Sequence, residues 1–216
     1  MIEIYKGIIF DLDGTILDSM KIWERADELF LSENGIACKP EISDIVKKMS
    51  IEESAQFFID KFRLPHTKGY VIDRIEEIVS EQYEKRIQLK PYVEQFLDWL
   101  DERNIPYCIA TATYKTLAES ALKRLGVLDR FKFLLTCSDV GEGKTSPRVY
   151  LDSAERLNLL PNEIAVFEDA FHCIETAKEA GFYVVGIFDE TSADEWDDIR
   201  KICNRTIISF KELITD

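Results

Sequence analysis

Six short apolar runs, the later ones separated by segments of helical periodicity, constrain the fold of this sequence more than any other feature. The runs cover residues 7–10, 107–111, 133–136, 164–167, 183–188 and 206–208. Helical spacing marks the segments between the later runs, at residues 114–125, 147–157, 170–180 and 194–202. Strands that alternate with helices predict a parallel sheet joined by helical crossovers. The expected fold class is therefore α/β.

Glycine, serine and proline support the predicted helix ends. Gly126 and Gly181 stand where two helices should stop, because glycine readily adopts the left-handed conformation found just past a helix end. Ser146 followed by Pro147 is typical of a helix start, with a capping hydroxyl and a proline at the first helical position.

The stretch from about residue 20 to residue 86 has a different pattern, with no evident strand. Apolar residues between 22 and 30 share one helical face, and Asn34 with Gly35 predicts the end of that helix. Ser50 and Glu53 match a capping box ahead of another helical pattern. With 216 residues, the chain can form one core and a smaller second unit. We therefore expect an α/β core of residues 1–17 and 90–216, and an inserted helical bundle of residues 18–89.

Composition and charge exclude several classes of function. The formal net charge is −14, which argues against a nucleic-acid partner because such proteins usually present a basic face. No apolar run is long enough to span a bilayer. The N-terminal stretch is too short and too acidic for a signal peptide, so we expect a cytoplasmic protein. The five cysteines include no C-x-x-C pair, which favours reduced thiols over a zinc site. A monomer is the default expectation.

The first apolar run ends in two carboxylates, within Asp11-Leu12-Asp13-Gly14-Thr15. Side chains alternate along an extended backbone, so Asp11 and Asp13 are expected to point the same way. Their mutual repulsion would raise one pKa unless a cation intervenes. A hard divalent ion such as Mg²⁺ accepts oxygen ligands and suits this position. Gly14 permits a tight turn whose backbone can approach an anion.

Other predicted strands also end in polar residues. Thr111 ends the second run, Glu168 and Asp169 follow the fourth, and Lys144 lies in a loop before a helix. Ligands of open parallel sheets bind outside the carboxyl ends of the strands. Carboxylates, a hydroxyl and an ammonium gathered there predict phosphoryl transfer, in which a metal and Lys144 hold phosphate oxygens and carboxylates attack and move protons.

This arrangement resembles the haloacid dehalogenase (HAD) superfamily, and in particular its phosphatases and phosphohexomutases with a helical cap, such as the β-phosphoglucomutases. The likeness covers essentially the whole chain. Asp11–Thr15 matches the family's first motif, Thr111 the second, Lys144 the third, and Glu168-Asp169 followed by Gly181 the fourth. The resemblance implies a Rossmann-like core with helices on both faces of the sheet, and a cap that closes over the substrate, excludes water and sets specificity.

The resemblance also implies roles for these residues. Asp11 would be the nucleophile that forms an aspartyl-phosphate, and Asp13 the general acid and then the base that activates water. Magnesium would be held by Asp11, by Asp13 through its backbone carbonyl and by Asp169, with Glu168 nearby. The residues expected to bind the phosphoryl group are Asp11, Thr111, Ala112 and Lys144. The implied function is magnesium-dependent hydrolysis of a small phosphorylated metabolite.

Three positions depart from the family pattern. Arg148 stands where an aspartate is frequent after the lysine motif, which puts a supporting contact in doubt. Cys173 replaces a frequent glycine after the fourth motif. The second motif reads Ala110-Thr111-Ala112-Thr113, and we expect Thr113 to be a helix cap rather than a ligand.

Alternative functions fit these residues less well. A phosphohexomutase would carry a cap histidine where Trp23 stands, and its glycine-bearing arginine loop is not evident in residues 48–53, so hydrolysis is favoured. Dehalogenases and phosphonate hydrolases lack the second aspartate, so Asp13 argues against both. A P-loop would need a glycine where Ser138 stands, five positions before Gly143. A non-catalytic phosphate-binding protein is disfavoured because every motif residue is intact, although fold alone would not exclude it.

Overall fold

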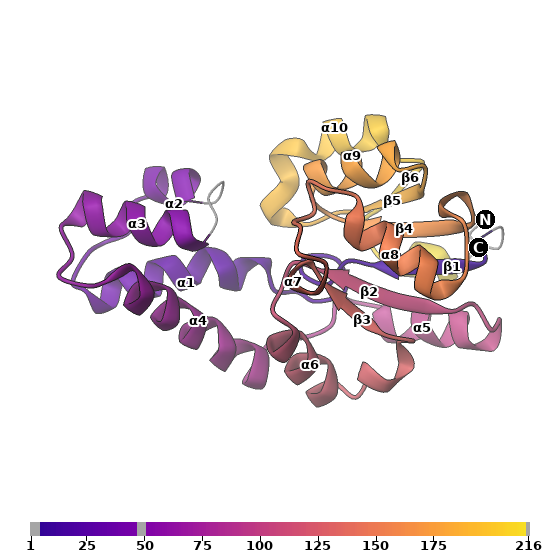
Figure 1. Cartoon of the computed structure of the whole chain (residues 1–216), viewed down its shortest axis with the longest axis horizontal. Helices are drawn as coiled ribbons and strands as arrows, with labels where there is room; N and C mark the ends of the chain where they lie inside the picture. The colour runs from indigo at the N-terminus through magenta and orange to yellow at the C-terminus, as the bar shows by residue number, and fades with distance from the viewer. Residues whose placement is uncertain (1–4, 47–50, 215–216) are drawn as a thin grey trace. The chain divides into compact units, whose positions relative to one another are not determined.

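The computed structural model describes residues 5–46 and 51–214 of the chain. It divides the protein into two compact units, one of Met1–Ser19 with Ile87–Asp216 and one of Met20–Arg86. The first unit is an α/β domain and the second is helical (Figure 1). No helix of the described ranges is long and apolar enough to cross a membrane.

The α/β unit contains a six-stranded sheet in the order β3-β2-β1-β4-β5-β6, with every neighbouring pair parallel. The strands are β1 (Gly7–Phe10), β2 (Tyr107–Thr111), β3 (Leu134–Thr136), β4 (Ile164–Glu168), β5 (Tyr183–Ile187) and β6 (Arg205–Ile207). This is the strand order of the Rossmann fold, in which the chain starts in the middle and winds outward in both directions. The carboxyl end of β1 is therefore flanked by those of β2 and β4, at the point where ligands bind in such sheets.

Helices of this unit lie on both faces of the sheet (Figure 1). They are α5 (Val93–Glu102), α6 (Lys115–Arg124), α7 (Cys137–Val140), α8 (Arg148–Leu157), α9 (Phe171–Glu179), α10 (Trp196–Ile202) and α11 (Lys211–Ile214). Short 3₁₀ segments cover Leu128–Arg130, Pro161–Glu163 and Glu190–Glu195. The predicted α/β class, with a parallel sheet and helices on both faces, is confirmed.

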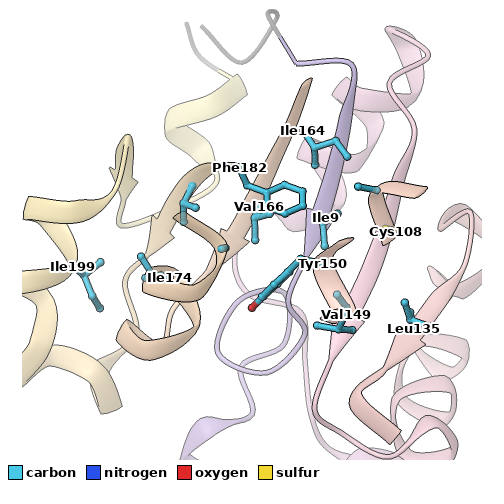
Figure 2. Packing of buried hydrophobic residues seen from close by; sticks show 14 residues of the cluster. Ile9, Cys108, Leu135, Val149, Tyr150, Ile164, Val166, Ile174, Phe182 and Ile199 are labelled. Atoms are coloured by element: carbon cyan, nitrogen blue, oxygen red, sulfur yellow. The ribbon is translucent and has the colours of Figure 1, made fainter. Parts of the chain in front are cut away.

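Alternation along the strands gives the sheet two apolar faces, as expected for a parallel sheet covered on both sides. On one face, Ile9 and Val166 belong to a buried cluster with Val149 of α8 and Ile174 of α9 (Figure 2). On the other face, Phe10 lies next to Phe167, with ring centroids 5.0 Å apart, in a group of buried aromatic rings. Two packed layers of helices thus hold the strand ends that carry the polar residues.

The helix ends of the α/β unit that glycine, serine and proline mark lie at or within one residue of their predicted positions. Gly126 and Gly181 follow the ends of α6 and α9 with φ values of 75° and 90°, as predicted. Helix α8 begins at Arg148, one residue later than expected, because Pro147 flanks the helix and the Ser146 hydroxyl accepts the Arg148 N–H at 3.3 Å. The capping box of Ser50 and Glu53 includes a residue outside the described ranges.

The helical unit consists of α1 (Met20–Glu33), α2 (Pro40–Val46), α3 (Ile51–Phe62) and α4 (Lys68–Lys85). Phe30 and Phe58 stack with ring centroids 6.0 Å apart, and both side chains are fully buried. Thr67 caps α4 by accepting the Tyr70 N–H at 3.2 Å. No strand occurs among the described residues of this unit. The division of the chain at residues 17/18 and 89/90 into a core and a functional cap stays a prediction.

Gly186 of β5 offers a test of how tightly the sheet packs against its helices. A Cβ at this position would lie 2.8 Å from both the Cys203 Sγ and the Ile199 Cγ2. Gly186→Ala is therefore expected to lower the free energy of unfolding by about 1–3 kcal/mol, measured by urea denaturation. Gly143→Ala is the control, because its Cβ meets no described atom within 4 Å, and it should stay within about 0.5 kcal/mol of wild type. Equal stabilities of the two variants would contradict the expected steric conflict.

Asp27 of α1 offers a test of pH-dependent stability. Burial raises the pKa of its carboxyl to about 7, above its value in the unfolded chain. Ionising Asp27 therefore costs more free energy in the folded protein than in the unfolded chain. This cost is absent below about pH 4, where the carboxyl is protonated in both states, and it grows up to about pH 7, above which the carboxyl is ionised in both. Asp27→Asn removes this cost, so the variant's gain in unfolding free energy over wild type should increase by about 2 kcal/mol from pH 5 to pH 8. Glu28→Gln, at an exposed neighbour, should show no such trend.

Candidate active site

The candidate site lies at the carboxyl edge of the sheet and centres on Asp11, the first residue after β1. The Asp11 N–H donates to the Phe167 carbonyl at 2.9 Å, which extends the β1–β4 pairing up to the carboxylate. The Asp11 side chain is buried, with 8% of its surface exposed. The loop after Asp11 turns at Gly14, whose φ of 81° is the left-handed conformation that glycine readily adopts.

Lys144 links Asp11 to the end of β4. Its ammonium donates hydrogen bonds to Asp11 Oδ1 and to Glu168 Oε1, and all three residues are buried. The Tyr150 hydroxyl of α8 donates to the same Glu168 oxygen at 2.8 Å. The other Glu168 oxygen accepts the Asp169 N–H at 3.1 Å. Glu168 is therefore held by a lysine, a tyrosine and the backbone of its own strand end.

Asp13 is held by two hydroxyl groups. Ser19 Oγ donates to Asp13 Oδ1 at 2.6 Å, and Thr113 Oγ1 donates to Asp13 Oδ2. The Thr113 N–H in turn donates to Thr111 Oγ1 at 3.0 Å. This chain of hydrogen bonds connects the end of β2 to the loop after β1 and fixes the orientation of the Asp13 carboxylate.

Asp169 completes the group of carboxylates. Its side chain is buried, and Asp169 Oδ1 accepts the Thr15 hydroxyl at 3.2 Å. Carboxylate oxygens of Asp11, Glu168 and Asp169 all lie within 4.8 Å of one another. Oxygen ligands this close, supplied by carboxylates, fit a hard divalent cation such as Mg²⁺.

The ionisation of these groups reflects their burial and crowding. Burial and then the charge of Glu168 raise the pKa of Asp11 to about 7, although Lys144 acts in the opposite direction. Burial, followed by the charges of Asp11 and Glu168, raises the pKa of Asp169 well above its ordinary value. Burial alone would lower the pKa of Lys144, but Asp11 and Glu168 outweigh it and raise that pKa. The site thus has an excess of negative charge that one ammonium does not balance.

The structure brings together most residues that the motifs singled out. Asp11, Lys144, Glu168 and Asp169 form one buried group, and Thr111 joins Asp13 through the bonds described above. The Asp13 carboxylate is not part of the group of close carboxylate oxygens; the predicted contribution of Asp13 to the metal is a backbone carbonyl. Ala112 follows β2 and is exposed.

The expectation that Thr113 caps a helix is wrong. Helix α6 begins at Lys115, and its N-cap residue is Tyr114, which makes no side-chain capping bond. Thr113 instead uses its hydroxyl to hold Asp13. The motif spacing could not distinguish the two roles, because a threonine before a helix commonly has the first one.

Other residues of the site were missed in the sequence. Ser19 and Thr15 are hydroxyl residues in or just beyond the first motif, so their proximity to the carboxylates was a usable signal. Tyr150 lies on the buried face of α8, where its apolar ring alone accounts for its position, and nothing in the sequence indicated its contact with Glu168.

Comparison with known proteins agrees with this geometry. The family model described as haloacid dehalogenase-like hydrolase matches residues 5–181. The chain belongs to this family. Among its relatives, hexitol phosphatase A of Escherichia coli is 30% identical over 84% of this chain and 82% of its own length. The β-phosphoglucomutase of Bacillus subtilis is 28% identical over 84% of this chain and 83% of its own length.

Solved structures show the same fold. The crystal structure of a putative β-phosphoglucomutase from Thermotoga maritima superposes with a TM-score of 0.83 at 21% identity and covers 97% of both chains. The predicted membership in the haloacid dehalogenase superfamily is confirmed, and the chain is an enzyme of this family of hydrolases.

The Tyr150 hydroxyl provides a test of the site's internal support. Tyr150→Phe removes only the hydrogen bond to Glu168 and is expected to lower the free energy of unfolding by about 1–2 kcal/mol in the metal-free protein, measured by urea denaturation. Tyr92→Phe is the matched control and should leave the free energy of unfolding nearly unchanged. Tyr92 is exposed, and the substitution keeps the ring that lies beneath Lys211. A Tyr150→Phe protein as stable as the control would show that the hydroxyl contributes nothing.

Proposed function

We propose that this protein is a magnesium-dependent phosphatase that hydrolyses a small phosphate monoester through an aspartyl-phosphate on Asp11. The observation that carries this proposal is the buried group of charged residues at the end of β1. Asp11 is paired with Lys144 there, and its carboxylate lies close enough to those of Glu168 and Asp169 for the three to bind one cation. A nucleophile, a cation site and a phosphate-binding ammonium in one place are the components that phosphoryl transfer needs.

Asp11 and Asp13 divide the chemistry between them. A carboxylate oxygen of Asp11 bonds to phosphorus while the ester oxygen leaves with a proton from Asp13. Asp13 then takes a proton from water, the water oxygen attacks phosphorus, and the bond to Asp11 breaks to release inorganic phosphate. Ser19 and Thr113 keep Asp13 oriented for both proton transfers through the hydroxyl bonds to its two oxygens.

The remaining polar residues bind and balance charge. Lys144 and the Thr111 hydroxyl are proposed to hold phosphate oxygens together with the backbone at Ala112. Thr111 Oγ1 accepts the Thr113 N–H, which leaves its own proton to donate. Magnesium, held by Asp11, Glu168, Asp169 and the Asp13 carbonyl, would neutralise negative charge on the transferring group.

The relatives support a phosphorylated sugar or polyol as the substrate class. One is named for hexitol phosphates and another for a phosphorylated glucose. Trp23 favours hydrolysis over phosphate transfer between sugars, because it stands where a phosphohexomutase would carry a histidine. An indole cannot act as a general acid or base near neutral pH, and the Trp23 N–H donates to the Tyr83 hydroxyl at 3.0 Å. We propose that residues 18–89 act as the cap that selects this substrate.

Hydrolysis of p-nitrophenyl phosphate by the purified protein tests this proposal. Activity is expected with Mg²⁺, should disappear with EDTA and should return with added Mg²⁺. Asp11→Asn should lower kcat at least about 10³-fold because the amide is a poor nucleophile. Asp98→Asn, which removes an exposed carboxylate paired with Arg130, should leave kcat unchanged.

A screen of phosphorylated sugars and polyols extends this test. Release of inorganic phosphate from such an ester would support the assignment. Failure of wild type to hydrolyse any member, or full activity of Asp11→Asn, would overturn it. Isomerisation of glucose 1-phosphate with a bisphosphate primer, without net phosphate release, would assign a mutase instead.

A further inference from the structure

Two largely buried charged residues outside the four motifs form an ion pair at the carboxyl edge of the sheet. Lys90 Nζ lies 2.8 Å from Asp189 Oδ2, and their side chains are 12% and 7% exposed. Buried charges are costly to desolvate, so a pair of this kind calls for an explanation beyond general stability. Neither residue has a role in the mechanism proposed above.

The pair joins two segments that are far apart in the sequence. Lys90 follows Leu89, which bridges to Leu17, and the Lys90 N–H donates to the Ile16 carbonyl at 2.8 Å. Asp189 lies two residues beyond the end of β5. The pair therefore connects the loop that carries the first motif to the carboxyl end of β5.

The pair lies at the same edge of the sheet as Asp169. Strands β4 and β5 are neighbours in register, with Glu168 opposite Gly186, so the residues just past both strands share one edge of the sheet. Asp169 directly follows β4 and Asp189 lies two residues past the end of β5, so the two residues leave neighbouring strands at this edge.

Each partner contacts the other and nearby polar groups. Asp189 Oδ1 accepts the Thr191 N–H at 2.9 Å and the Thr191 hydroxyl at 2.7 Å, which leaves Oδ2 for Lys90. Lys90 also donates to the Phe188 carbonyl at 3.0 Å. The two opposite charges cancel at short range, so the pair as a whole places little net charge beside Asp169.

We propose that Lys90 and Asp189 are positioning residues that set the cation affinity of the Asp11, Glu168 and Asp169 group. Asp189 neutralises the Lys90 ammonium, which would otherwise repel a cation, and Lys90 neutralises the Asp189 carboxylate, which would otherwise add to the negative charge. This inference rests on the proposed function, because it takes that group to be the magnesium site.

The proposal predicts effects of opposite sign for the two single substitutions. Asp189→Asn leaves an uncompensated ammonium near Asp169 and should weaken Mg²⁺ binding about tenfold. Lys90→Met leaves an uncompensated carboxylate and should strengthen binding. The double substitution removes both charges and should return the Kd to within about threefold of wild type. A purely structural role would instead weaken binding in both single variants.

Isothermal titration of the EDTA-treated full-length protein with Mg²⁺ measures these affinities without any substrate, and Mn²⁺ binding followed by electron paramagnetic resonance checks them. Asp198→Asn breaks an exposed ion pair with Lys201 and serves as the matched control, with an unchanged Kd. Thermal unfolding of each variant verifies that it is folded. If Lys90→Met does not fold, Lys90→Gln, which also removes the ammonium, takes its place in the single and the double variant.

The outcomes separate this inference from the proposed function. A wild-type protein that binds no Mg²⁺ would overturn the cation site and the inference together. A wild-type protein that binds Mg²⁺, with an Asp189→Asn Kd changed by less than about twofold or with both single variants weakened, would overturn the inference alone. Weakening in Asp189→Asn that is reversed in the double variant would support it.

Discussion

The contact of the Lys144 ammonium with both Asp11 and Glu168 is the interaction on which the rest of the site depends. Carboxylates buried this close repel one another, and burial itself disfavours their charge. Lys144 offsets part of this cost and keeps Asp11 at the end of the central strand. Burial, followed by the negative charges of Asp11 and Glu168, raises the pKa of Asp169, and a cation bound here would relieve the same excess of charge.

The sheet topology explains why such costly neighbours meet at all. Strand β1 lies between β2 and β4, so residues that are about 100 and about 157 positions later in the chain end beside Asp11. Figure 2 shows the buried cluster on one face of the sheet, and Phe10 and Phe167 pack on the other face. The crowded charges persist because the strands that carry them are packed on both faces and cannot separate without breaking a packed layer.

The fold class and the polar residues at the strand ends could be predicted from the sequence. Periodicity along the chain predicts the strands, and the strand ends then locate the polar residues. Each predicted strand appears within two residues of its expected ends, and Asp11, Glu168 and Asp169 were found because they stand at or directly after the end of a predicted strand. The same rule would have found Asp189, just past β5. Thr113 was misread because a local pattern offered a cap, while its actual partner, Asp13, lies 100 residues away. Lys90 and Tyr150 are engaged by tertiary contacts that no local pattern encodes.

The charges at this edge of the sheet can be considered together. Four buried carboxylates, those of Asp11, Glu168, Asp169 and Asp189, face the ammonium groups of Lys144 and Lys90. If Asp13 carries the proton that it is proposed to give to the leaving group, the excess is two negative charges, which equals the charge of one magnesium ion. With one magnesium ion bound, a phosphate ester would bring its own negative charge to a site that is neutral rather than repulsive. The ion pair of Lys90 and Asp189 contributes nothing to this excess, and that neutrality is why breaking it from either side should shift the balance in opposite directions.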